Sequence, residues 1–191
     1  MTLNATSISD LIDALAARTS TPGGGAAAAI AAALGCAAGA MATRYTSGAK
    51  YATVETAALH LGDLLVLAAR DCIRLGDADA AAYAAVTIAR KAKDSAATIV
   101  AEQRASAVPA DLLATCADHA TELARFMASC NPHLLSDVKV GIHLLTGAGR
   151  AAWQTLLVNH PNQQLRDTAA THLERLLLAD RQALTSTEHS S

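Results

Sequence analysis

Aromatic residues are scarce in this sequence: they make up 3% of the 191 residues, with one tryptophan and one phenylalanine. Neither sign of charge is in large excess, because the formal net charge is −2. The chain therefore offers no basic field to a nucleic acid. It also has no polybasic segment beside an amphipathic helix, which disfavours binding to a membrane surface.

Alanine, leucine and valine must fill most of the core, because apolar residues still reach 52%. Alanine is the best helix former and a poor strand former, and few positions alternate strictly between apolar and polar. These features predict an all-α fold. We expect an up-and-down bundle of about six or seven helices, in one domain over residues 1–191.

The four cysteines lack the C-x-x-C spacing that is typical of zinc and redox sites. They are Cys36, Cys72, Cys116 and Cys130, and each has apolar, helix-forming neighbours. We expect buried free thiols in a reducing cytoplasm, with no disulfide framework and no metal site. The histidines His119, His133, His143 and His160 also lack the spacing of metal ligands.

Capping residues and apolar runs predict the first helices. Ser7 and Asp10 have the spacing of a capping box and open a helix to about Arg18. A Pro/Gly-rich loop covers residues 19–25. The uncharged segment Ala26–Ala42 has 17 residues, near the short limit of a membrane span, but 11 of them are alanine. We favour a helix buried in the bundle or at a subunit interface.

Glycine and proline predict the remaining boundaries, because both residues interrupt helices. The expected helices are 51–75 closed by Gly76, 77–103, one from Pro109 to the break at Asn131-Pro132, 134–158, and a last one begun by Pro161.

Three consecutive glycines, Gly23, Gly24 and Gly25, precede the Ala-rich segment. Backbone N–H groups at a helix N-terminus can hold a carboxylate or another anion. The same residues also fit a flexible loop between helices. The segment alone leaves both interpretations open.

Four motifs in order resemble one family. T-P-G-G-G at 21–25, with Arg44-Tyr45-Thr46 after the Ala-rich helix, resembles the opening of formiminotetrahydrofolate cyclodeaminases and methenyltetrahydrofolate cyclohydrolases. Further resemblances are G-A-K-Y at 48–51, D-A-A-A-Y at 79–83 and N-P-H-L-L-S-D at 131–137. The resemblance implies a helical bundle that forms a homodimer, with a folate bound at or near the subunit contact.

The resemblance also implies one-carbon folate chemistry with a tetrahydrofolate derivative as substrate, no metal and no permanently bound cofactor. One reaction hydrolyses 5,10-methenyltetrahydrofolate to 10-formyltetrahydrofolate. The other cyclises 5-formiminotetrahydrofolate with loss of ammonia. We prefer hydrolysis, because the chain has no formiminotransferase domain. The expected location is cytoplasmic, with no nucleic-acid or membrane partner.

Both reactions pass through a tetrahedral carbon and need proton transfer. The resemblance assigns this role to Asp137 first and then to Asp79, while Lys50 pairs with the folate glutamate tail or polarises the substrate. The implied substrate-binding residues are Gly23, Gly24, Gly25, Tyr51, Asn131 and Ser136. Each carboxylate also fits a charge that stabilises a helix N-terminus. Lys50 alone also fits a solvated side chain, and Tyr51 fits a core position.

Several positions depart from the family pattern, among them Lys91-Ala92-Lys93 in place of a Leu-Pro ending. Ala26 replaces a usual serine, Gln154 replaces an asparagine, and Lys139 stands where a small residue is common. They support an alternative hypothesis, in which the chain is a non-catalytic relative that binds a small anionic ligand or acts as an assembly partner.

Overall fold

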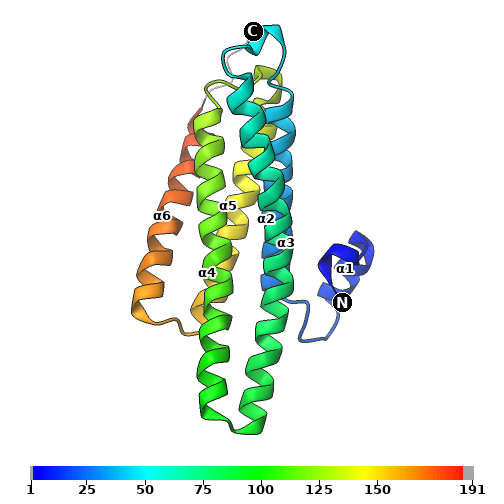
Figure 1. Cartoon of the computed structure of the whole chain (residues 1–191), viewed down its shortest axis with the longest axis vertical. Helices are drawn as coiled ribbons and strands as arrows, with labels where there is room; N and C mark the ends of the chain where they lie inside the picture. The colour runs from blue at the N-terminus through cyan, green and yellow to red at the C-terminus, as the bar shows by residue number, and fades with distance from the viewer. Residues whose placement is uncertain (1, 187–191) are drawn as a thin grey trace.

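The computed structural model describes residues 2–186, in which six α-helices and three short 3-10 helices occur without a strand (Figure 1). The α-helices are α1 (Ile8–Ala16), α2 (Gly24–Arg44), α3 (Glu55–Ala92), α4 (Ser95–Phe126), α5 (Leu135–Val158) and α6 (Gln163–Thr185). The 3-10 helices are η1 (Leu3–Ala5), η2 (Ala49–Tyr51) and η3 (Pro132–Leu134). The predicted all-α bundle is confirmed.

Helices α2 to α6 run alongside one another, and α1 stands apart from the bundle (Figure 1). As predicted, the Ser7 side chain caps α1 by accepting a hydrogen bond from the Asp10 N–H at 3.2 Å. α2 packs mainly against α3 and α5, and α4 packs against α3, α5 and α6. The N-terminal segment is tied to the bundle by Leu3, whose N–H donates to the Asp77 carboxylate at 2.8 Å.

The predicted break at Gly76 is wrong, because α3 continues through it to Ala92 and no helix begins at Asp77. Gly76 serves the crossing with α2, where a Cβ would lie 3.0 Å from the Cβ of Ala29. The chain reverses instead at Lys93, whose φ of 56° is left-handed. Asp94 then caps α4 through its side chain.

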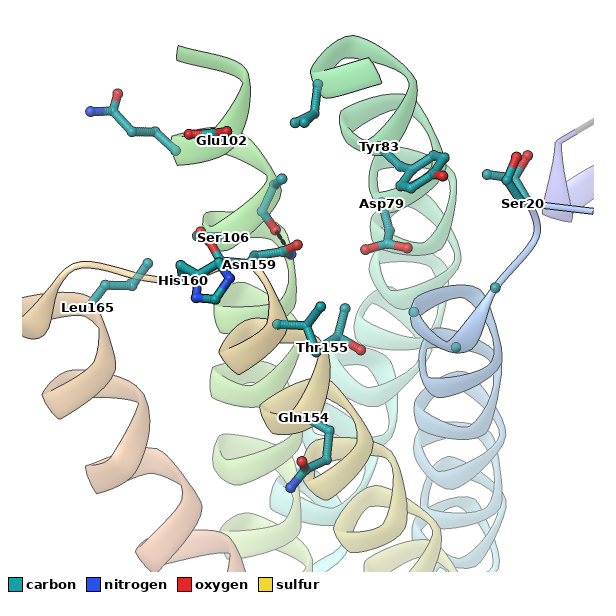
Figure 2. A pocket seen from close by; sticks show the side chains of 18 of the residues that line it. Ser20, Asp79, Tyr83, Glu102, Ser106, Gln154, Thr155, Asn159, His160 and Leu165 are labelled. Carbon is teal, nitrogen blue, oxygen red and sulfur yellow. Dashed lines mark hydrogen bonds between the residues drawn. The ribbon is translucent and has the colours of Figure 1, made fainter. Parts of the chain in front are cut away.

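Pro109 lies inside α4, so the prediction that it begins a helix is also wrong. Because proline has no N–H, the carbonyl of Ala105 loses its helical partner. The Asn159 side chain replaces it, with Nδ2 donating to the Ala105 oxygen at 2.6 Å. The Ser106 hydroxyl donates to the Asn159 carbonyl at 3.0 Å (Figure 2). These two bonds clamp the end of α5 to α4.

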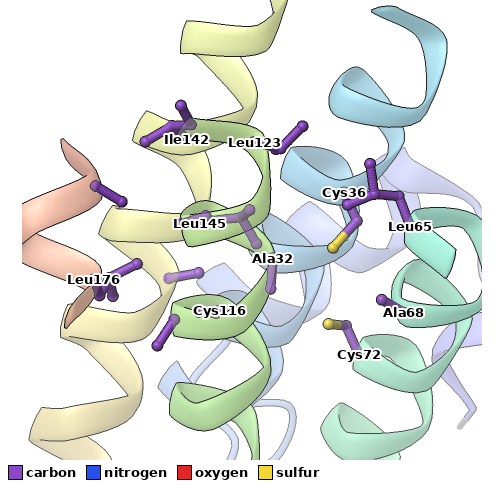
Figure 3. Close-up of a cluster of buried hydrophobic side chains, with 14 of the residues drawn as sticks. Ala32, Cys36, Leu65, Ala68, Cys72, Cys116, Leu123, Ile142, Leu145 and Leu176 are labelled. Carbon is purple, nitrogen blue, oxygen red and sulfur yellow. The ribbon is translucent and has the colours of Figure 1, made fainter. Parts of the chain in front are cut away.

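The core is built from small and aliphatic side chains, and the predicted burial of all four cysteines is confirmed. Figure 3 shows the Cys36 and Cys72 thiols between α2 and α3. The neighbouring Cys72 thiol, together with burial, raises the pKa of Cys36. The backbones of α2 and α5 approach closely at Gly35 and Gly141, since a Cβ on Gly35 would lie 2.9 Å from the Gly141 carbonyl oxygen.

α2 buries its inner face and leaves an apolar outer face exposed. Leu34 is 55% and Met41 40% exposed, and with exposed Ala27 they recur every seven residues. We call these three residues the α2 outer stripe. Among the described residues, α2 is the helix that is long and apolar enough to cross a membrane, a property that buried core helices share. The prediction that the helix over Ala26–Ala42 is buried is therefore confirmed for its inner face, and its outer face is exposed.

The clamp between α4 and α5 predicts a coupled pair of stability changes. Asn159→Ala should lower the free energy of unfolding by about 1–3 kcal/mol, because the buried Ala105 carbonyl loses its partner. Pro109→Ala restores an N–H for that carbonyl, so the loss caused by Asn159→Ala should shrink in the Pro109→Ala background. Urea unfolding followed by circular dichroism measures the cycle. Equal losses in both backgrounds would contradict the clamp.

Candidate functional site

A cavity of about 880 Å³ opens at the end of the bundle where α2 begins and α5 ends (Figure 2). Its lining comes from the residues before and at the start of α2, from α3 and α4, and from the end of α5 with the loop to α6. Such a volume is typical of a pocket for a small molecule. The polar side chains of the lining include Asp79, Tyr83, Arg90, Glu102, Gln154, Thr155 and His160.

Asp79 lies in the middle of α3 and not near a helix start as predicted. Its carboxyl group lies over Gly25 in the first turn of α2, where a Cβ would be 2.2 Å from Asp79 Oδ2. Any other residue at Gly25 would therefore displace the carboxyl. Burial raises the pKa of Asp79, although a helix N-terminus alone would favour the ionised form. A carboxyl group that protonates readily can both accept and donate a proton.

The glycine loop belongs to the same cavity. Gly23, Gly24 and Gly25 all line it, and the position of a Cβ on Gly24 meets open space. The carboxyl of Asp79 lies against Gly25 in the first turn of α2. The structure thus brings together two of the predicted motifs, and anion binding by the backbone N–H groups of this turn stays a prediction.

The other predicted site residues lie at the far end of the bundle. Lys50 and Tyr51 are in η2 after the end of α2, and Asn131, Ser136 and Asp137 lie between α4 and the first turn of α5. Asp137 and the cavity residue Thr155 are both on α5, about 27 Å apart at a rise of 1.5 Å per residue. One copy of the chain therefore does not bring Lys50 or Asp137 to the cavity.

Asn131 joins the far ends of the helices. Its N–H donates to the Thr46 hydroxyl at 3.0 Å, and its Nδ2 donates to the Tyr45 carbonyl at 3.1 Å. Tyr51 is half-buried rather than a core residue, and the Lys50 ammonium lies 5.6 Å from its ring centroid. The two hydrogen bonds give Asn131 a structural role, and its predicted role in substrate binding stays a prediction.

The departures from the family pattern fall in different places. Ala26 is 2% exposed and is not among the cavity-lining residues, so its missing hydroxyl is not a missing cavity donor. Gln154 does line the cavity. Lys139 donates to the Ser186 carbonyl at 2.9 Å, at the C-terminal end of α6.

Sequence reasoning missed Arg90 and His160 as cavity residues. The predicted helix 77–103 ran through the reversal at Lys93, and so concealed that Arg90 on α3 faces α4, where it pairs with Glu102 at 2.7 Å. His160 follows the end of α5 in a left-handed conformation, with φ of 51°. Within residues 2–186, no three His, Cys, Asp or Glu side chains are grouped so that they could hold a metal ion.

The raised pKa of Asp79 predicts how stability depends on pH. Because the folded-state pKa lies above the ordinary value of 3.8, ionised Asp79 destabilises the fold at neutral pH. Asp79→Asn should therefore be at least as stable as the wild type at pH 7. The difference should vanish as the pH falls through the folded-state pKa and below 3.8, where the wild-type carboxyl is neutral.

Thermal unfolding over this pH range measures the effect, with the exposed Asp111→Asn on α4 as the control. A wild type that is more stable than Asp79→Asn at pH 7 would show that Asp79 is a stabilising charge.

Comparisons with known proteins agree with this architecture. The family model described as Formiminotransferase-cyclodeaminase matches residues 7–176. The fold is similar to the crystal structure of formiminotetrahydrofolate cyclodeaminase from Thermotoga maritima, with a TM-score of 0.87 and 23% identity over 94% of each chain. No match is found among the curated proteins. The chain therefore belongs to the Formiminotransferase-cyclodeaminase family.

Proposed function

We propose that this protein is an enzyme of one-carbon folate metabolism. The preferred reaction is hydrolysis of 5,10-methenyltetrahydrofolate to 10-formyltetrahydrofolate, and the second is cyclisation of 5-formiminotetrahydrofolate with loss of ammonia. One observation carries the proposal: the carboxyl of Asp79, with its raised pKa, lies over Gly25 at the wall of a cavity of substrate size.

The chemistry needs proton transfer and a negative charge near a cation. In hydrolysis, water adds to the cationic methenyl carbon, and Asp79 accepts the proton that the water loses. The bond from this carbon to N5 then breaks, N5 takes up a proton and the carbon becomes a formyl group. In cyclisation, N10 attacks the carbon of the protonated formimino group, and Asp79 moves a proton from N10 to the departing ammonia. The ionised carboxylate also attracts the methenyl cation.

The remaining cavity residues suit the other parts of a folate. Tyr83, 51% exposed on α3, offers a ring face to a flat heterocycle. Gln154 and Thr155 offer hydrogen-bonding groups on α5. Arg90 is an arginine of the lining, and the part of its guanidinium that does not pair with Glu102 can bind a carboxylate of the glutamate tail. This role replaces the one expected for Lys50, which lies at the far end of the same chain.

We further propose that two copies pack antiparallel through the α2 outer stripe. The stripe is apolar along the helix, which favours burial against an identical surface in a two-fold dimer. The antiparallel arrangement would bring the second copy's Lys50 and Asp137 towards the cavity. In such a dimer these residues could act in catalysis, although they lie far from Asp79 within one copy of the chain.

The alternative is a non-catalytic relative that binds a small anionic ligand or acts as an assembly partner. Gln154 in the cavity lining is the departure that supports it, whereas Ala26 lies outside the lining. Turnover by the wild type excludes this alternative directly. The cytoplasmic location stays a prediction.

Asp79→Asn should slow turnover by about 10²–10⁴-fold, because the change keeps the size and removes the proton acceptor. Asp137→Asn, at the far end of the bundle, is the matched comparison. It should slow turnover less than Asp79→Asn does. Loss of methenyltetrahydrofolate absorbance measures hydrolysis, and its appearance from the formimino substrate measures cyclisation. Full activity of Asp79→Asn would overturn the role of Asp79.

The proposed dimer predicts that Leu34→Glu yields a monomer with unchanged helical circular dichroism, because it places a charge in the α2 outer stripe. Leu178→Glu, at a 50% exposed leucine on α6, is the matched control and should stay dimeric. Light scattering coupled to size-exclusion chromatography measures both masses. A monomeric wild type, or a dimer that survives Leu34→Glu, would contradict the interface.

A further inference from the structure

His160 has a backbone conformation that folding alone does not favour. It follows the C-terminus of α5 with φ of 51°. Helices commonly end on a left-handed residue. Glycine is usual there because it has no Cβ, and asparagine follows because its short polar side chain can form local hydrogen bonds. A left-handed histidine is less common at this position than glycine, which makes its side chain a candidate for a functional role.

The structure holds the residue before His160 in place through the clamp described above. Pro109 leaves the Ala105 carbonyl without a helical donor, and Asn159 Nδ2 occupies it at 2.6 Å. The Ser106 hydroxyl fixes the Asn159 carbonyl at 3.0 Å. An interruption in α4 is thus converted into an anchor for the end of α5.

The residues after His160 are fixed as well. Pro161 restricts its own φ, and the Asn162 side chain caps α6 by accepting from the Leu165 N–H at 2.8 Å. Backbone on both sides therefore positions the imidazole at the cavity wall, although the side chain itself is exposed.

His160 lies across the cavity from Asp79. Figure 2 shows His160 beside Asn159 and Ser106, on the side formed by α4 and α5, and Asp79 with Tyr83 on the side formed by α3. An imidazole can donate a proton through one ring nitrogen and accept through the other. The cavity thus has a proton-carrying group on each of two walls.

We propose that His160 is a second catalytic residue of this site, which donates a proton to N5 as the bond between N5 and the tetrahedral carbon breaks. The inference rests on the proposed function. Before this step Asp79 releases to solvent the proton that it took from the attacking water. The hydroxyl on the carbon then becomes a carbonyl, and its proton goes to the Asp79 carboxylate. His160 then regains a proton from solvent and Asp79 releases one. Together with the proton lost by the attacking water, the cycle releases one proton overall and consumes one water.

Replacement of His160 by glycine and by glutamine separates this role from a structural one. His160→Gly relieves the left-handed backbone, so its melting temperature should equal or exceed that of the wild type. Its kcat should nevertheless fall by about 10²-fold or more, with little change in KM. His160→Gln keeps hydrogen bonding without proton exchange and should lose kcat similarly. His60→Gln, on an exposed part of α3 outside the cavity lining, is the control and should behave as wild type.

The outcomes distinguish the two levels of the proposal. Wild-type kcat in folded His160→Gly and His160→Gln overturns the role of His160 and leaves the proposed function intact. A loss confined to KM also overturns it, because it shows binding without proton transfer. A wild type that converts neither folate overturns the proposed function and this inference together.

Discussion

The close approach of α2 to its neighbours is the constraint on which the rest of the structure depends. α2 and α5 meet at Gly35 and Gly141, where a Cβ on either glycine would lie 2.9 Å from the other's carbonyl oxygen. The same close packing continues to the start of α2, where Gly25 leaves room for the carboxyl of Asp79. A helix built from small residues therefore serves packing along its length and chemistry at its first turn.

The site follows from this packing and from one interruption. Asp79 is desolvated where α3 packs against the start of α2, and this loss of solvent raises its pKa. On the other wall, Pro109 interrupts α4, and the clamp through Asn159 gives the end of α5 a fixed position. Each wall includes a residue in an unfavourable state, the desolvated Asp79 on one and the left-handed His160 on the other. Such local costs in stability are typical of residues kept for function.

The helical class, the cap of α1, the buried thiols and the membership of the glycine loop and Asp79 in one site could be predicted from the sequence. These features could be predicted because they follow from the composition, from local spacing and from the order of the motifs. Gly76 and Pro109 misled the prediction because their effects depend on tertiary contacts: Gly76 allows a crossing with α2, and the carbonyl freed by Pro109 is satisfied by Asn159, which lies 50 residues further along the chain. The separation of Asp137 from Asp79 was equally invisible, since a motif gives order along the chain and not distance.

Direct titration of Asp79 tests whether close packing over Gly25 creates a carboxyl that exchanges protons readily. Carbon-13 NMR of the labelled aspartate side chains, with Asp79→Asn used for assignment, gives its pKa in the folded protein. The account predicts a pKa above the ordinary value of 3.8. A pKa at or below that value would show that the α2 N-terminus stabilises the carboxylate, and would contradict a proton-transfer role based on desolvation.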